Sequence, residues 1–300
     1  MNNKYPHIRK INLILLFASI WSLFAIGQDK PGIFYSISGN GLKEPSYIYG
    51  TYHLIKDSYL NGFPTVKEKL SEAKGVVVEV LIDSSQIGAA REAGMLKNKT
   101  LSSLLPASTV DSLDAVLKES IGVGIAAVNN MKPMNITLTL SLVHLLKSSG
   151  TSMKQYTGDP LDQYFTQTGK ANGKKVTALE SIDQQMNILF NSESEEEQVK
   201  ALRIFLNKKT EMLSMGDSLL HYWLQGDLNK MYGLAEAMNF SSSGEDYLIK
   251  KRNLAWMEKL PELMQQGSTF IAVGALHLAG PWGLTKLLTD AGYTITPVKL

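Results

Sequence analysis

Two short elements of the same form, Gly50–His53 and Gly274–His277, carry the histidines with the clearest chemical potential in this chain. In each element a strand-like segment precedes the glycine, and a leucine follows the histidine. A glycine where a strand ends permits a close backbone approach, and parallel α/β sheets bind ligands beyond the carboxyl ends of their strands. The two imidazoles could therefore converge on one metal ion. The alternative is that both are structural histidines near strand ends.

Two carboxylates follow other strand-like segments. Glu79 interrupts the apolar run Val76–Val80, where a charge is expensive unless it is paired or bound to a metal. We expect Glu79 at the same sheet edge as His53, as a third metal ligand or a general base, with a buried salt bridge as the alternative. Glu180 directly follows Val176–Leu179, so it is either a site residue or an acid at a helix start.

Arg252 lies in a basic cluster of the kind that usually forms a solvated helix face, but it could also bind an anion or a developing oxyanion. We expect the remaining polar candidates to serve in helix packing, loops, turns or caps: His144, His221, Asp83, Asp159 and Asp162.

The strand-like segments gather at the two ends of the chain. They are Ile33–Ser38, Ser46–Thr51, Val76–Val80, Val176–Leu179, Ser268–Val273 and Tyr293–Val298. Helical patterns cover 65–73 with Thr65 as N-cap, 101–105, 108–120, 135–147, much of 192–223, and 281–291 with Pro281 at the first helical position. The β–α–β unit over 46–82 predicts a parallel pair. We therefore predict an α/β domain over residues 28–300, with a mixed, largely parallel central sheet formed by the N- and C-terminal segments and a large helical insertion in the middle.

The composition excludes several classes of protein. A hydrophobic content of 44% and a charged content of 19% are ordinary for a globular chain. The net charge of +2 gives no reason to expect a nucleic-acid partner. The absence of cysteine excludes disulfides, thiolate nucleophiles and cysteine-ligated metals. The sequence contains no HExxH, no GxSxG and no P-loop motif.

The first residues have the pattern of a secretory signal peptide. Lys4, Arg9 and Lys10 precede an apolar run from Ile11 to Ile26, and small residues stand before position 28. We expect residues 1–27 to be a signal peptide and the protein to be exported, to a periplasmic or extracellular location, with an uncleaved anchor as the alternative. No other segment is apolar over a membrane length, so we expect no membrane span in the mature chain.

The segments GTYHL, VVVEV, VTALESIDQQ, KRNLAW and AVGALHLAGPWGLTKLLTDAGYTITPV resemble the TraB/GumN family, which includes Tiki-type proteins and has been linked to the erythromycin-esterase and ChaN-like superfamily. The resemblance covers about residues 31–300. It implies a metal-dependent hydrolase, for Tiki-type members a peptidase, whose two GxxH motifs and glutamate match His53, His277 and Glu79. Glu180 and Arg252 fall in further family-like segments. Tyr52 stands where the family often has a smaller aliphatic residue, which should reshape the pocket wall.

Our hypothesis is hydrolysis of an amide or ester by a metal-activated water, with a peptide or small molecule as substrate. His53, His277 and Glu79 would hold a divalent ion, for which zinc, manganese and cobalt are all suitable. Arg252 would stabilise the oxyanion. The rival hypothesis is a non-catalytic exported protein that binds a metal or a haem-like ligand in the same crevice. A wide separation of the two histidines would exclude both the hydrolase hypothesis and the binding-protein hypothesis.

Overall fold

The computed structural model describes residues 32–81, 83–148, 153–237 and 246–300, so the expected signal peptide lies outside the described residues. Its strands are β1 (Phe34–Gly39), β2 (Ser46–Thr51), β3 (Gly75–Val78), β4 (Lys175–Ala178), β5 (Thr269–Gly274) and β6 (Tyr293–Pro297). They form one six-stranded sheet in the order β4-β3-β5-β2-β1-β6. The mixed α/β architecture that the sequence predicts is confirmed.

Four neighbouring strands of this sheet, β4, β3, β5 and β2, run parallel, and β1 is antiparallel to both β2 and β6. The predicted parallel pair of β2 and β3 needs correction. The C-terminal strand β5 lies between them and bonds to both. The reason is that β5 is fully apolar from Phe270 to Val273, as suits a central strand covered on both faces. Both Gly-x-x-His elements therefore leave adjacent strands at the same sheet edge.

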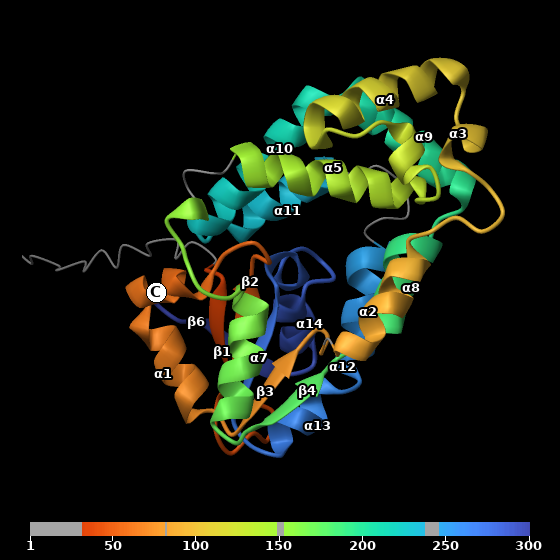
Figure 1. The fold of residues 1–300 in the computed structure, drawn as a ribbon. Coiled ribbons are helices and arrows are strands. Elements are labelled where there is room, and N and C mark those ends of the chain that lie inside the picture. The colour runs from red at the N-terminus through yellow and green to blue at the C-terminus, as the bar shows by residue number, and fades with distance from the viewer. Residues whose placement is uncertain (1–31, 82, 149–152, 238–245) are drawn as a thin grey trace, which may run out of the picture.

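The described residues form the following α-helices: α1 (Pro64–Glu72), α2 (Ile87–Ala93), α3 (Leu101–Leu104), α4 (Ala107–Ile121), α5 (Pro133–Ser148), α7 (Leu161–Ala171), α8 (Ile182–Asn191), α9 (Glu195–Asn207), α10 (Lys209–Leu224), α11 (Leu228–Ala237), α12 (Lys251–Met257), α13 (Leu260–Gln265) and α14 (Leu284–Asp290). Helix α7 packs against β3, β4 and β5. Helices α4, α5, α9, α10 and α11 form an arch beyond the carboxyl ends of the parallel strands, which confirms a helical insertion (Figure 1).

The buried apolar side chains form two separate cores. The larger core surrounds the sheet and includes Trp223 and Trp256 from the helices. The smaller core lies within the insertion, around Leu113, Ile136 and Phe205. Helix α10 joins them, because its start packs in the smaller core and its end places Trp223 against the sheet.

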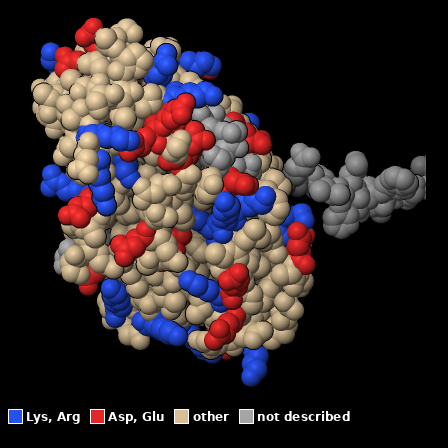
Figure 2. Space-filling view, turned by 90° about the vertical axis from the view of Figure 1, so that its right-hand side faces the viewer, with Lys and Arg blue, Asp and Glu red and all other residues tan. Residues whose placement is uncertain are grey.

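Two predicted helix starts are wrong. Helix α1 begins at Pro64 after Phe63 rather than after Thr65, because proline is favoured in the first turn and leaves no bondable N–H there. Helix α14 begins at Leu284 after Gly283, so Pro281 lies in the preceding turn. No helix among the described residues is long and apolar enough to cross a membrane. On the face shown in Figure 2, acidic and basic side chains are interspersed.

Candidate functional site

The first Gly-x-x-His element follows β2 and is fixed by a residue from α7. His53 Nδ1 is 2.7 Å from Asp162 Oδ2, and the Thr51 hydroxyl donates to Asp162 Oδ1 over 2.7 Å. The hydrogen bond to Asp162 raises the pKa of His53 to about 9. Because the His53 side chain is 67% exposed, solvent screens this pair, and its role is orientation rather than stability. The bond directs the other ring nitrogen, Nε2, toward Gly274.

The second element places His277 in the turn Ala275–Leu278 after β5, where the ring is buried. Its Nδ1 is 2.7 Å from Asn253 Oδ1, and Asn253 Nδ2 donates to the carbonyls of His277 and Trp282. Since Asn253 Nδ2 faces two acceptors, Oδ1 is the accepting atom and His277 Nδ1 carries the proton. Burial lowers the pKa of His277 to about 3. The ring is therefore neutral, with the lone pair on Nε2.

The glycines of the two elements have different physical roles. A Cβ on Gly50 would lie 2.9 Å from the Cα of Ala275 and from Leu278 Cδ1, so this glycine lets one element pack directly on the other. A Cβ on Gly274 would lie 3.2 Å from Glu79 Oε1, 3.6 Å from His53 Nε2 and 3.7 Å from His277 Cδ2. All three predicted ligands therefore surround one point, and the two imidazoles are not widely separated.

The sheet itself brings the two glutamates together. Backbone pairing of β3 with β4 continues past the strand ends, where Leu179 N donates to Val78 O and Glu180 N donates to Glu79 O. Both carboxylates are buried at that edge. Gln185, in the first turns of α8, donates to Glu180 Oε1 over 3.2 Å and to Glu79 Oε2 over 3.5 Å. Two neighbouring buried carboxylates can both stay ionised only when a cation lies close to them.

Arg252 is that cation. Its Nη2 lies 2.6 Å from both Glu79 Oε2 and Glu180 Oε1, and its Nε donates to Glu180 Oε2 over 3.1 Å. Its Nη1 donates to Leu248 O over 3.1 Å and to His277 Nε2 over 2.9 Å. The Arg252 side chain is only 10% exposed, so the alternative of a solvated helix face is wrong. The buried salt bridge foreseen as an alternative for Glu79 is present.

These contacts determine the charge of Glu79. Burial acts to raise its pKa, but nearby positive charges and the Gly274 N–H, 2.6 Å from Oε1, outweigh burial and hold the pKa below its ordinary value. A charge on His277 cannot contribute at neutral pH, because the pKa of that ring is itself about 3. Arg252 and His53 remain as the cations, and Arg252 is the closer contact. Glu79 is therefore ionised throughout the physiological range.

All five predicted site residues meet at this sheet edge, and sequence reasoning missed three partners. Asp162 was expected to be a turn or cap residue, yet it holds His53. Asn253 and Gln185 were not singled out. Asp162 lies in the first turn of α7 and Asn253 directly follows Arg252, but neither sequence position indicates that the side chain contacts a distant histidine.

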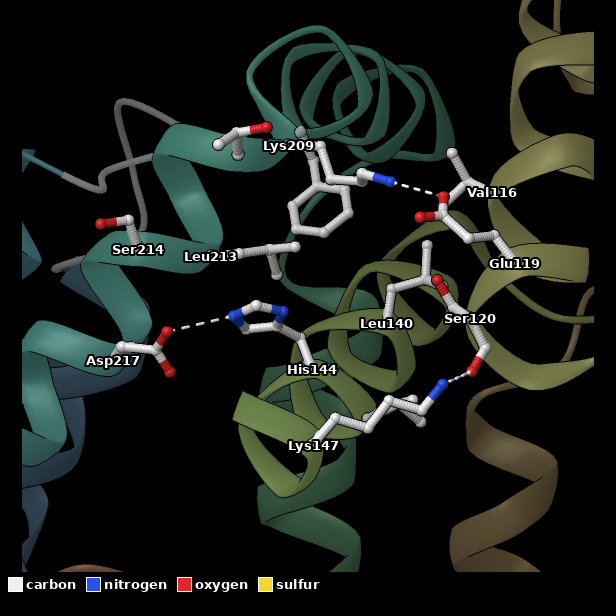
Figure 3. Close-up of a pocket in the computed structure, with 13 residues that line it drawn as sticks. Val116, Glu119, Ser120, Leu140, His144, Lys147, Lys209, Leu213, Ser214 and Asp217 are labelled. Atoms are coloured by element: carbon white, nitrogen blue, oxygen red, sulfur yellow. Dashed lines mark hydrogen bonds and ion pairs between the residues drawn. The ribbon is translucent and has the colours of Figure 1, made fainter. Parts of the chain in front are cut away.

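The other histidines lie outside this group. His144 on α5 is 3.2 Å from Asp217 on α10, in a pocket of about 420 Å³ within the helical insertion (Figure 3). His221 is exposed and contacts Gln225 one turn later in the chain.

The donor types suit a divalent metal, but their present arrangement is not a complete cage. Within the described ranges, no group of three or more His, Cys, Asp or Glu side chains is already placed to hold a metal ion. At this edge Arg252 is bonded to His277 Nε2 and Glu79 Oε2. The nitrogen and oxygen types, the neutral ring of His277 and its Asn253 partner fit zinc-type ligation.

The amino-acid sequence that builds this sheet and its polar group matches a known family over nearly all of the described chain. The chain belongs to the TraB/PrgY/gumN family, whose model matches residues 33–297. It is 24% identical over 262 residues to "Uncharacterized protein YbaP" of Shigella flexneri, covering 86% of this chain and 92% of that protein. The corresponding protein of Escherichia coli K12 is 29% identical over 131 residues, which is 43% of this chain and 47% of that protein. No solved structure matches the chain significantly.

Proposed function

We propose that this protein is a metal-dependent hydrolase that cleaves amide or ester bonds, with peptides as the main substrate class. The observation that carries the proposal is the convergence of His53 Nε2, Glu79 Oε1 and the His277 ring on the space above Gly274. Two imidazoles and one carboxylate form a ligand set that leaves positions open for substrate and water. A divalent ion bound there supplies a Lewis acid and lowers the pKa of a coordinated water.

The surrounding residues favour His277 as a ligand. Asn253 holds the proton on Nδ1, so the ring presents Nε2 in its neutral form and no proton has to leave it. His53 differs, because its pKa of about 9 means that it gives up a proton when it binds a metal.

For Glu79, the structure favours the role of ligand over that of general base. Oε1 accepts from the Gly274 N–H and Oε2 from Arg252, so both oxygens are engaged. A carboxylate whose pKa is held below its ordinary value is a poor proton acceptor at neutral pH. An ionised carboxylate is, in contrast, ready to bind a cation.

A role of Arg252 at the oxyanion requires a change of its contacts. Its N–H groups are directed at Glu79, Glu180, His277 and Leu248. Arg252 can stabilise a developing negative charge only after at least one of these bonds is released.

The test is hydrolysis of a fluorogenic peptide library, together with a simple ester, by protein stripped with a chelator and reloaded with zinc, manganese or cobalt. We expect activity to return with metal in wild type and in the control His221→Ala, and to remain at background in His277→Ala. Metal binding without turnover of any substrate would favour the non-catalytic binding protein instead. Equal activity in stripped and reloaded protein would exclude the metal-dependent mechanism.

We also propose that the protein is exported through its N-terminal 27 residues, on the sequence pattern alone. N-terminal sequencing of protein recovered from the periplasm or the medium should give a chain that starts at Gln28. An intact Met1 terminus on membrane-bound protein would indicate an uncleaved anchor instead.

A further inference from the structure

Arg252 uses every hydrogen-bond donor that a guanidinium has. An arginine side chain carries five N–H groups. One on Nε and one on Nη2 point at Glu180, the other on Nη2 points at Glu79, and those on Nη1 point at His277 and Leu248 O. Every N–H group of the Arg252 guanidinium therefore has an acceptor at this sheet edge.

Two of the groups that Arg252 contacts, the His277 ring and the Glu79 carboxylate, belong to residues that we propose as metal ligands. Nη1 is 2.9 Å from His277 Nε2, and Nη2 is 2.6 Å from Glu79 Oε2. Because Nδ1 of His277 carries the proton, Nε2 has a single lone pair, which accepts from the guanidinium. That lone pair cannot bind a metal ion at the same time, so the two cations exclude each other.

We propose that Arg252 is a resident cation of this site: it neutralises Glu79 and Glu180 when no metal is bound, and it must release His277 before a divalent cation can bind. This inference rests on the proposed metal site and adds the residue that sets the affinity of that site. Without any cation, the two buried carboxylates would repel each other, and one of them would have to take up a proton.

The chain around Arg252 is suited to such a movement. Helix α12 begins directly after the π-helical turn Asp246–Lys250, and Arg252 bonds to the carbonyl of Leu248 inside that turn. A π-helical turn contains an extra residue and is frequent at functional sites. Behind Arg252, the Trp256 ring lies 4.8 Å from Cζ and remains a partner for the cation after release from His277.

Co²⁺ affinity, measured by titration calorimetry on the metal-free protein, tests this inference without any substrate. The variants are Arg252→Met, which removes the charge, and Arg252→Lys, which keeps it but cannot form the planar fork. The matched control is Lys251→Met, since Lys251 is the next cation on the same helix and lies over the Tyr247 ring instead of in the site. His277→Ala reports whether binding occurs at this edge.

We expect Arg252→Met to bind Co²⁺ at least about tenfold more tightly than wild type, because a positive charge that competes for the same ligands is removed. Arg252→Lys should have an intermediate affinity, and Lys251→Met should equal wild type. Metal-free Arg252→Met should also melt at a lower temperature, with a larger rise on adding Co²⁺ than wild type shows.

Two results would overturn the inference, and they differ in what they leave standing. If His277→Ala abolishes binding but neither Arg252 variant binds more tightly, Arg252 is not a competitor, although the metal site remains. If His277→Ala binds Co²⁺ as well as wild type, the proposed site itself is wrong and the inference fails with it. Should Arg252→Met not fold, Arg252→Lys decides the question, because it retains the charge.

Discussion

At the scale of single residues, the two glycines before the histidines separate the requirements of folding from those of the site. Gly50 is needed because the backbone of Ala275 passes close by. Gly274 has ordinary backbone angles, with φ −54° and ψ 136°, and is needed only because the predicted ligands surround it. Glycine is therefore required for a different physical reason in each of the two Gly-x-x-His elements.

This difference predicts that two alanine substitutions affect different properties, metal affinity for Gly274→Ala and stability for Gly50→Ala. Gly274→Ala should keep the free energy of unfolding within about 1 kcal/mol of wild type, because its backbone suits alanine. Its metal affinity should fall at least about tenfold, since the methyl group enters the ligand space. Gly50→Ala should lose about 1–3 kcal/mol of stability through overpacking. Denaturant unfolding and metal titration measure both; equal stability losses would contradict the assignment.

The contact of His53 with Asp162 predicts a titration that depends on one carboxylate. In metal-free protein the ring should titrate near pH 9, and in Asp162→Asn near its ordinary value of 6.5, as followed by NMR of the imidazole. The folded pKa lies above the unfolded one, so the small stability that this solvent-screened pair contributes is present in full only below pH 6.5. That contribution disappears as the pH rises through 9. An unchanged titration in Asp162→Asn would show that the bond is absent in solution.

Sequence reasoning found the residues whose strand context is local. His53, Glu79, Glu180 and His277 each follow an apolar strand, so their shared edge could be predicted. It missed contacts made by side chains on helices. Whether α7 brings Asp162, or α12 brings Asn253, to a histidine depends on packing angles that no periodicity encodes.

At the scale of elements, long-range packing also explains why the predicted direct pairing of β2 with β3 was wrong. The β–α–β pattern correctly predicts that β2 and β3 run in the same direction, but it is silent about a strand arriving from the far end of the chain. The insertion of β5 is what makes the two Gly-x-x-His elements adjacent. Helix boundaries were predicted only coarsely, since α9 begins after the capping residue Ser194, inside the helical stretch predicted over 192–223.

One lysine ties α1 to the loop before β4. Lys174 Nζ donates to the carbonyls of Leu70, Ser71 and Ala73, which are left open at the end of α1. Lys174→Ala should therefore lower the free energy of unfolding by about 1–3 kcal/mol. The neighbouring Lys175, which is exposed, is the matched control. Thermal melting of both variants measures the effect; equal losses would refute the capping role.

At the scale of the whole molecule, the two separate cores predict that the helical insertion and the sheet can unfold independently. The insertion has its own buried cluster around Leu113, and only a few helices connect it to the sheet. Leu113→Ala should destabilise that cluster by about 2–5 kcal/mol. Amide exchange should accelerate in α4, α5 and α9, while β2 and β5 keep their protection.

The control for that substitution is Leu142→Ala on α5, where the leucine is 43% exposed, and little change is expected. If Leu113→Ala accelerates exchange in β2 and β5 equally, the molecule unfolds as one unit. The site would then share the stability of the insertion instead of being independent of it.

The central claim is that one divalent ion binds between His53, Glu79 and His277 and displaces Arg252. The most direct test is a crystal structure with Co²⁺, in which anomalous scattering locates the ion. We predict one peak within about 2.0–2.2 Å of His53 Nε2, His277 Nε2 and a Glu79 oxygen, with Arg252 turned away from His277. A crystal at saturating Co²⁺ with Arg252 still bonded to His277 and no peak at this edge would contradict the account.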